Sequence, residues 1–160
     1  MKRIGIALTT MLLALTSVHA AEVLIKGRNV QQKNEVVIHH QAEDKSYGSG
    51  TYRSQGLTFL EDAKVATFVN QGAFSWDGGV SRHTGFIVRK YPDGSMTTAR
   101  YAGATRKSEG QKVREWNGTA EIISGTGRFA GAKGHGTYAG GRYANGMAVT
   151  DWELKAVLAE

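Results

Sequence analysis

The side chains that could serve acid–base or metal chemistry are scattered along this sequence of 160 residues. His39 and His40 are adjacent, so on a β-strand they would point to opposite faces and could not bind one ion together. His83 and His135 are isolated in the sequence. Cysteine is absent, which excludes thiolate ligands and a thiol nucleophile. We therefore predict no metal site and no cofactor, and we expect the histidines to be ordinary surface or hydrogen-bonded side chains.

Two acidic residues and one glycine-rich segment match catalytic or cofactor motifs in the wrong surroundings. Glu115 and Glu121 share one face of a predicted strand, and the polar residues between them indicate a solvent-exposed face, which argues against a paired-carboxylate hydrolase. Residues 125–130, GTGRFA, match a variant of the dinucleotide-binding fingerprint. The glycines that follow disfavour the helix that this motif requires. The segment instead predicts a tight corner between strands, with Phe129 in the core.

Aromatic side chains give a stronger indication of function. The candidate ligand site consists of the aromatic residues on the apolar-facing side of four predicted strands, joined by polar groups that could orient a bound molecule: Phe86, Trp116, Tyr138 and Trp152, with Tyr101 and Arg114. The inward face of a small barrel is either filled by side chains or opens just enough for one small ligand. Packing alone also explains these residues, so both interpretations remain open at this point.

The remaining sequence predicts short strands that would position these side chains. Period-2 alternation and β-branched or aromatic residues mark eight segments: residues 22–26, 35–40, 64–70, 82–90, 95–102, 114–123, 136–143 and 149–158. Tight turns are expected at residues 91–94 (YPDG) and 145–146 (NG). This pattern indicates an all-β sandwich or barrel. The polar, Gly/Ser-rich residues 41–56 are expected to form a long loop that covers the barrel mouth.

The N-terminal residues predict export from the cytoplasm. Lys2 and Arg3 precede an apolar segment and a small-residue cleavage site after Ala20, as in a secretory signal peptide. Threonine and serine interrupt the apolar segment, which is too short for a membrane anchor. We therefore expect a periplasmic or secreted protein without stable membrane insertion, in which residues 1–20 are the signal peptide and residues 21–160 form a single domain of common size.

The charge of the chain argues against a nucleic-acid partner. The formal net charge is +6, and 18 basic residues against 14 acidic ones remain when the first 20 residues are set aside. The basic residues are dispersed, whereas nucleic-acid-binding proteins usually gather them on one face or one element. We expect no nucleic-acid binding.

Two segments carry a family resemblance. Residues 93–103, DGSMTTARYAG, and residues 116–140, WNGTAEIISGTGRFAGAKGHGTYAG, resemble the bacterial secreted relatives of the allene oxide cyclase and dirigent barrels. The similarity covers residues 84–138, and Ser124 replaces the first glycine of a Gly-Gly pair in the family pattern. The resemblance implies an eight-stranded antiparallel β-barrel that often forms a dimer or trimer. The matching residues are a structural corner, and none of the catalytic groups of the plant cyclases can be placed by motif.

Three functions are compatible with these observations. The leading hypothesis is a barrel that binds a small, mostly apolar molecule in its lumen. The second is a cofactor-free cyclase or isomerase, because holding a reactive substrate in one conformation can by itself lower a barrier. The third is a structural or envelope-interaction protein with a packed core, in which the outer residues Val65, Ile87 and Ile123 form a subunit interface. A cavity would separate the first two hypotheses from the third, and turnover would separate the first from the second.

Overall fold

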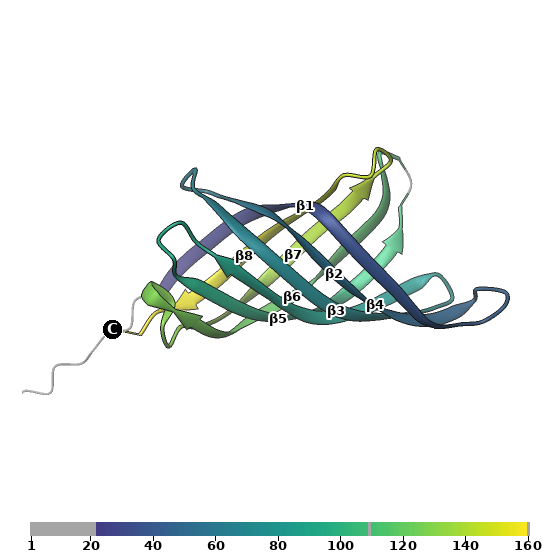
Figure 1. The fold of residues 1–160 in the computed structure, drawn as a ribbon, viewed down its shortest axis with the longest axis horizontal. Helices are drawn as coiled ribbons and strands as arrows, with labels where there is room; N and C mark the ends of the chain where they lie inside the picture. Colours follow the sequence, from purple (N-terminus) through teal and green to yellow (C-terminus); the bar gives the residue numbers. More distant parts are fainter. Residues whose placement is uncertain (1–21, 109, 160) are drawn as a thin grey trace, which may run out of the picture.

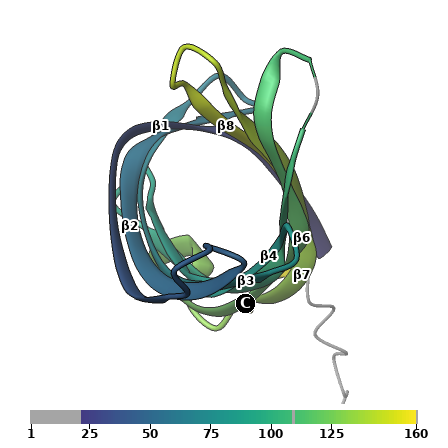
Figure 2. The same cartoon turned by 90° about the vertical axis from the view of Figure 1, so that its right-hand side faces the viewer.

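Eight antiparallel strands form a closed barrel in the computed structural model, which describes residues 22–108 and 110–159. The strands are β1 (Glu22–Gln41), β2 (Tyr47–Leu60), β3 (Val65–Asp77), β4 (Val80–Lys90), β5 (Met96–Lys107), β6 (Lys112–Thr126), β7 (Lys133–Tyr143) and β8 (Ala148–Val157). Each strand pairs with the next, and residues 22–31 of β1 pair with β8, so the sheet closes on itself. Figure 2 shows the resulting ring from one end. The predicted fold is confirmed, while the predicted signal peptide lies outside the described residues.

The two ends of the barrel differ in how they are filled. The hairpins β1–β2, β3–β4 and β7–β8 lie at one end, and the short 3₁₀ helix η1 (Gly127–Phe129) lies at the other, together with the C-terminus (Figure 1). A buried apolar cluster fills the second end: Ala66, Tyr91, Ile122, Phe129, Ala132, Trp152, Leu154 and Ala156. We refer to this as the closed end and to the hairpin end as the open end. Phe129 lies in the core, as the sequence predicted.

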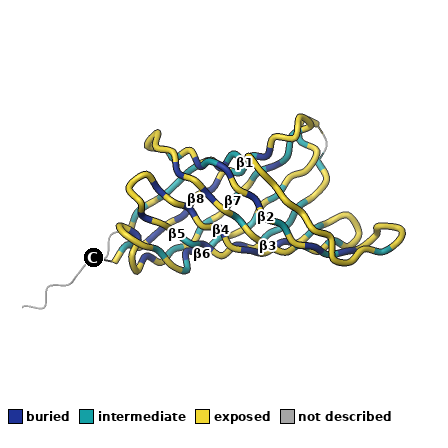
Figure 3. Tube along the Cα trace, in the orientation of Figure 1, coloured by how far each residue is buried: buried dark blue, intermediate teal, exposed yellow. Residues whose placement is uncertain are grey.

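Strand β1 corrects the prediction for the start of the domain. Residues 22–26 and 35–40, predicted as two strands, belong to one strand, and the polar residues 31–34 between them continue it through a register shift between Gln31 and Lys33. Pairing with β8 ends at Gln31, whereas β2 pairs with β1 on both sides of the shift, so backbone hydrogen bonds to β2 continue a strand that its polar sequence would interrupt. Residues 32–41 are exposed on both faces, as the burial pattern in Figure 3 shows.

The predicted gating loop is also wrong. Most of residues 41–56 belong to β2, and only residues 42–46 connect it to β1. Gly48 and Gly50 face the barrel interior, where an added Cβ would overlap the ring of Trp76 and approach the ring of Phe74 to 2.8 Å, respectively. The glycines therefore make room for aromatic rings on β3. The many glycines of this segment led to the prediction of a loop. In the structure, the strand needs glycine at these positions so that the aromatic rings can pack against it.

The alternation along β4 is the reverse of the expected one. Phe86 was predicted to face the lumen, but its side chain is 51% exposed on the outer surface. His83, Ile87 and Arg89 occupy the inner face instead. Ile87 is consequently buried and cannot belong to an outer subunit interface, whereas Val65 is exposed. A one-residue change of register exchanges the two faces of a strand, and here the polar character of His83 and Arg89 concealed the inner face.

Two predicted turns and the predicted alternation of β8 agree with the structure. The turn at residues 91–94 is closed by a hydrogen bond from the Tyr91 amide to the Ser95 carbonyl, with Gly94 at a φ of 82°. Gly146 has a φ of 87° in the last hairpin turn. In β8, Trp152 faces inward and the acidic residues on either side of it face outward, as the alternation predicted.

Candidate ligand-binding site

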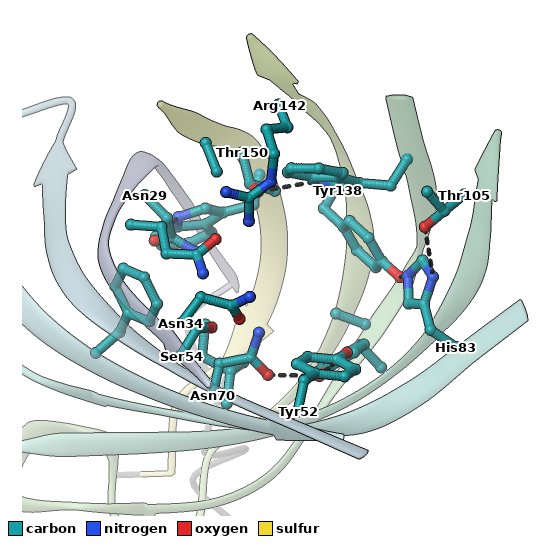
Figure 4. A pocket seen from close by; sticks show the side chains of 18 of the residues that line it. Asn29, Asn34, Tyr52, Ser54, Asn70, His83, Thr105, Tyr138, Arg142 and Thr150 are labelled. Carbon is teal, nitrogen blue, oxygen red and sulfur yellow. Dashed lines mark hydrogen bonds between the residues drawn. The ribbon is translucent and has the colours of Figure 1, made fainter. Parts of the chain in front are cut away.

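A cavity of about 280 Å³ occupies the barrel interior above the closed end. Its lining reaches the exposed residues Val36 and Arg114 near the open end, so the cavity opens there. Leu154 and Trp152, which belong to the buried cluster of the closed end, form part of its floor. Ligand pockets in proteins commonly measure about 300–1,000 Å³, so this one is suited to a small molecule. Figure 4 shows the side chains that surround it.

The hydroxyl of Tyr101 is the centre of the first polar network in the cavity wall. It donates a hydrogen bond to Oδ1 of Asn70, and the hydroxyl of Tyr52 lies 2.5 Å away. A phenol has one proton to donate. With the Tyr101 proton directed to Asn70, Tyr52 is the donor in the Tyr52–Tyr101 bond. The oxygen of Tyr52 thus retains acceptor capacity for a bound molecule.

A second network, beside the first, joins strands β4, β5 and β7. Nε2 of His83 lies 2.7 Å from the hydroxyl of Tyr138, and Nδ1 of His83 lies 3.2 Å from Oγ1 of Thr105 (Figure 4). In one tautomer of the imidazole, Nε2 accepts the phenolic proton. In the other tautomer, Nε2 donates to the phenol, which then directs its own proton to a bound molecule. The two networks touch through an edge-on contact between the rings of Tyr101 and Tyr138, whose centres are 5.9 Å apart.

Glycines on neighbouring strands allow these tyrosines to lie flat against the wall. A Cβ on Gly85 would overlap the hydroxyl of Tyr101, and a Cβ on Gly118 would overlap that of Tyr138. Rings that cross a neighbouring strand need such an absence of side chain. The Gly–Tyr pairs therefore fix the position of both hydroxyls and keep the centre of the lumen open.

Burial keeps three phenols and one imidazole of the wall uncharged at neutral pH. It is the largest influence that raises the pKa of the phenols Tyr52, Tyr101 and Tyr138, and for Tyr101 the neighbouring phenols raise the pKa further. Burial also lowers the pKa of the His83 imidazole below its ordinary value of 6.5. These four side chains therefore act as neutral hydrogen-bonding groups, able to orient or polarise an oxygen atom of a bound molecule.

The two tryptophans of the wall present apolar rings because their N–H groups are already bonded. Nε1 of Trp116 donates to Oγ1 of Thr150 at 2.9 Å, and Nε1 of Trp152 donates to Oδ1 of Asn29 at 3.0 Å. With their polar edges satisfied within the wall, both indoles offer mainly apolar surface to the cavity.

The charged residues of the lining all carry the same sign. Arg89, Arg114 and Arg142 line the cavity, and no aspartate or glutamate of the described residues does so. Arg114 and Arg142 are directly paired across β6 and β7 near the open end. Like charges directly opposite each other weaken a strand pair, so this arrangement is not explained by barrel stability.

The structure brings together five of the six site residues predicted from sequence. Tyr101, Arg114, Trp116, Tyr138 and Trp152 line the cavity, and Phe86 does not. Sequence reasoning missed four polar lining residues that define the site: Tyr52, Asn70, His83 and Arg89. One signal was present for His83 and Arg89, since both share the alternation of Gly85 and Ile87 on β4.

Two further findings concern the residues that the structure describes, 22–108 and 110–159. This part of the chain holds no group of three or more His, Cys, Asp or Glu residues that could bind a metal ion. Within the same residues, no helix has the length and apolarity needed to cross a membrane.

Comparison with known proteins identifies the fold. No protein-family model matches the sequence, and a search of curated proteins gives no significant match. A solved structure of a pterocarpan synthase dirigent protein aligns with 96% of this chain and 100% of its own chain, with a TM-score of 0.54 and 14% sequence identity. The chain therefore has a dirigent-like barrel fold. At this level of identity, the similarity concerns the fold and not the chemistry.

Proposed function

We propose that the protein binds a small, mostly apolar molecule in the lumen of its barrel. The observation that carries this proposal is the cavity of about 280 Å³, whose wall combines aromatic rings with a few fixed hydroxyl and amide groups. Binding sites for small molecules typically have this composition, in which the apolar surface supplies affinity and the polar groups supply orientation. The cavity also favours ligand binding over the alternative of a packed-core structural protein.

The direct test is to identify a ligand that co-purifies with the protein. Native mass spectrometry of the protein isolated from its own compartment, followed by solvent extraction after denaturation, should reveal a small molecule released on unfolding. Ala120 lines the cavity, so Ala120→Phe should fill the lumen and abolish co-purification. Phe86→Ala removes an aromatic ring from the outer surface and should leave it unchanged. A ligand retained equally by Ala120→Phe would show that binding occurs elsewhere.

A second candidate function is a cofactor-free cyclase or isomerase of the allene oxide cyclase-like type. The observation that favours it is the His83–Tyr138 pair beside the Tyr52–Tyr101 pair, which aims neutral hydrogen-bonding groups at one enclosed space. The synthase name of the dirigent protein with the same fold adds support. Adding the extracted ligand back to ligand-free protein and following it by chromatography separates the functions. Binding alone returns the same compound, whereas an isomerase converts it at a rate that Tyr138→Phe reduces.

We also propose that the protein is exported and forms a dimer or trimer. Residues 1–20 have the features of a signal peptide, so N-terminal sequencing of the exported protein should begin at Ala21.

The outer face of β3 and β4 carries the exposed apolar residues Val69, Phe86 and Val88, of which Val69 and Val88 are cross-strand partners. Exposed apolar patches often mark subunit contacts. The mass of the native protein gives its oligomeric state, and an exclusively monomeric protein would contradict this part of the proposal.

A further inference from the structure

Arg89 is a buried cation at the floor of the cavity. Its residue is 4% exposed, and the guanidinium carbon lies 3.9 Å from the centre of the Trp152 ring. Nε has no hydrogen-bond partner. Within residues 22–108 and 110–159, no carboxylate lies within 4 Å of the guanidinium nitrogens. The contact with Trp152 accounts for one face of the guanidinium and leaves its Nε–H without a partner among the described residues.

A buried arginine without an anion is costly, because the guanidinium has lost its hydration without gaining a partner. Burial lowers the pKa of Arg89 to about 10, so the side chain still carries its charge at neutral pH. Buried ionisable groups with a strongly shifted pKa in a cavity are concentrated at binding and catalytic sites. The stability of the empty barrel therefore does not account for Arg89.

The distribution of the other charges points to the missing partner. Several acidic residues of the barrel wall lie on its outer surface in ion pairs, such as Glu121 with Arg100 and Asp151 with Arg28. Around the cavity, Arg114 and Arg142 add positive charge near the open end. A concave site of one sign with low-dielectric walls concentrates the field and attracts ligands of opposite charge.

We propose that the ligand is an apolar molecule with a single carboxylate group, and that Arg89 binds this carboxylate. The inference rests on the proposed function and specifies the chemical class of the ligand. The carboxylate enters first and forms paired N–H···O bonds with the planar guanidinium. The apolar remainder of the ligand lies against Trp116, Trp152 and the tyrosine rings. Arg114 and Arg142 attract the anion to the open end and do not hold it in the final complex.

Two fluorescent probes that differ by one charged group test this assignment. N-phenyl-1-naphthylamine is neutral, and 1-anilinonaphthalene-8-sulfonate carries an oxyanion on the same ring system. The wild-type protein should bind the sulfonate about tenfold more tightly or better, which is the range expected for a charge-assisted hydrogen-bonded pair. Displacement of the bound sulfonate by 2-naphthoate, but not by 2-naphthamide, should then extend the preference to carboxylates.

Substitution of Arg89 should remove the preference without damaging the barrel. Arg89→Met keeps length and contact with Trp152, so the neutral probe should bind within about twofold of wild type while the advantage of the sulfonate disappears. Arg100→Met, on the outer face of β5, makes the same change in net charge and should leave the preference intact. Arg114→Met should reduce the association rate and its salt dependence more than the dissociation rate.

Thermal unfolding provides a second, ligand-independent measurement. Replacing an unpaired buried cation by an apolar side chain of similar length should leave the melting temperature of the empty protein unchanged or raised. If Arg89→Met instead lowers the melting temperature and weakens both probes equally, Arg89 is a structural residue and the proposal is wrong. If wild type binds both probes equally, lumen binding stands and the carboxylate assignment fails. If neither probe binds, both the lumen-binding function and the carboxylate assignment are contradicted.

Discussion

The hydroxyl of Tyr138 lies 2.7 Å from Nε2 of His83, inside a barrel whose other histidines described here are exposed. This pair gives the site a titratable group that is buried but uncharged. Its effect on stability follows from burial, which lowers the pKa of His83 below its ordinary value of 6.5.

Stability should therefore fall as the solution becomes more acidic than pH 6.5. Well above that pH, His83 is neutral in both the folded and the unfolded protein. Its protonation then has no effect on the free energy of unfolding. As the pH drops, the unfolded chain takes up a proton that the folded protein resists, and the free energy of unfolding decreases. Urea titrations at pH 7.5 and 5.5 measure this loss. His83→Gln should show a smaller loss, and the exposed control His135→Gln should match wild type.

The contact between Gly85 and Tyr101 should be intolerant of a methyl group. Gly85→Ala should lower the free energy of unfolding by about 1–3 kcal/mol, the usual cost of overpacking. The added Cβ would also overlap the carbonyl oxygen of Gln71, which is backbone. For this reason Tyr101→Phe in the same protein should not restore stability. Thr84→Ala, on the outer face, is the control. Full rescue by Tyr101→Phe would show that the hydroxyl alone sets the constraint.

Removing the hydroxyl of Tyr101 should cost more than removing that of Tyr52. Tyr101→Phe leaves both Tyr52 and Asn70 without their partner, and we expect a loss of about 1–3 kcal/mol. Tyr52→Phe removes a single bond and leaves the bond between Tyr101 and Asn70 in place. Denaturant unfolding of the two variants provides the comparison, and equal losses would contradict the central position of Tyr101.

At the seam between β1 and β8, the inward residue should matter more than the ion pair beside it. Asp151 and Arg28 form a bidentate but exposed pair, so Asp151→Asn should cost less than about 1 kcal/mol. Trp152→Ala removes a buried ring and the hydrogen bond to Asn29, and should cost about 3–5 kcal/mol. If Asp151→Asn opened the barrel, the surface charges rather than the core would hold the seam.

The sequence contained enough information for the barrel because its later strands obey simple alternation. Trp116 and Trp152 were placed on the inner face by their polar neighbours, and the turn residues Gly94 and Gly146 adopt the positive φ that their motifs require. Strands β1 and β2 were missed in part because their neighbours, not their own residues, determine them. The two segments predicted within β1 and the loop predicted in place of β2 were opposite errors that left the strand count at eight.

The polar part of the site could not be obtained by the same reasoning. An alternation rule assigns the more apolar face to the interior, and on β4 that rule selects Phe86 over His83 and Arg89. Burial of Arg89 is a property of the closed barrel, in which its guanidinium lies against Trp152 of β8, a strand remote in sequence. His83 and Arg89, two polar residues of β4 that line the cavity, are thus found where the local pattern and the packed structure disagree.

The most direct test of lumen binding is a titration of ¹⁵N-labelled protein with N-phenyl-1-naphthylamine, followed through the indole N–H resonances of the three tryptophans. Trp116 and Trp152 line the cavity, whereas Trp76 does not and donates to the carbonyl of Lys45 near the open end. We predict that the resonances of Trp116 and Trp152 shift in a saturable manner while that of Trp76 stays in place. Saturable shifts confined to Trp76, or no shift at any tryptophan, would contradict ligand binding in the lumen.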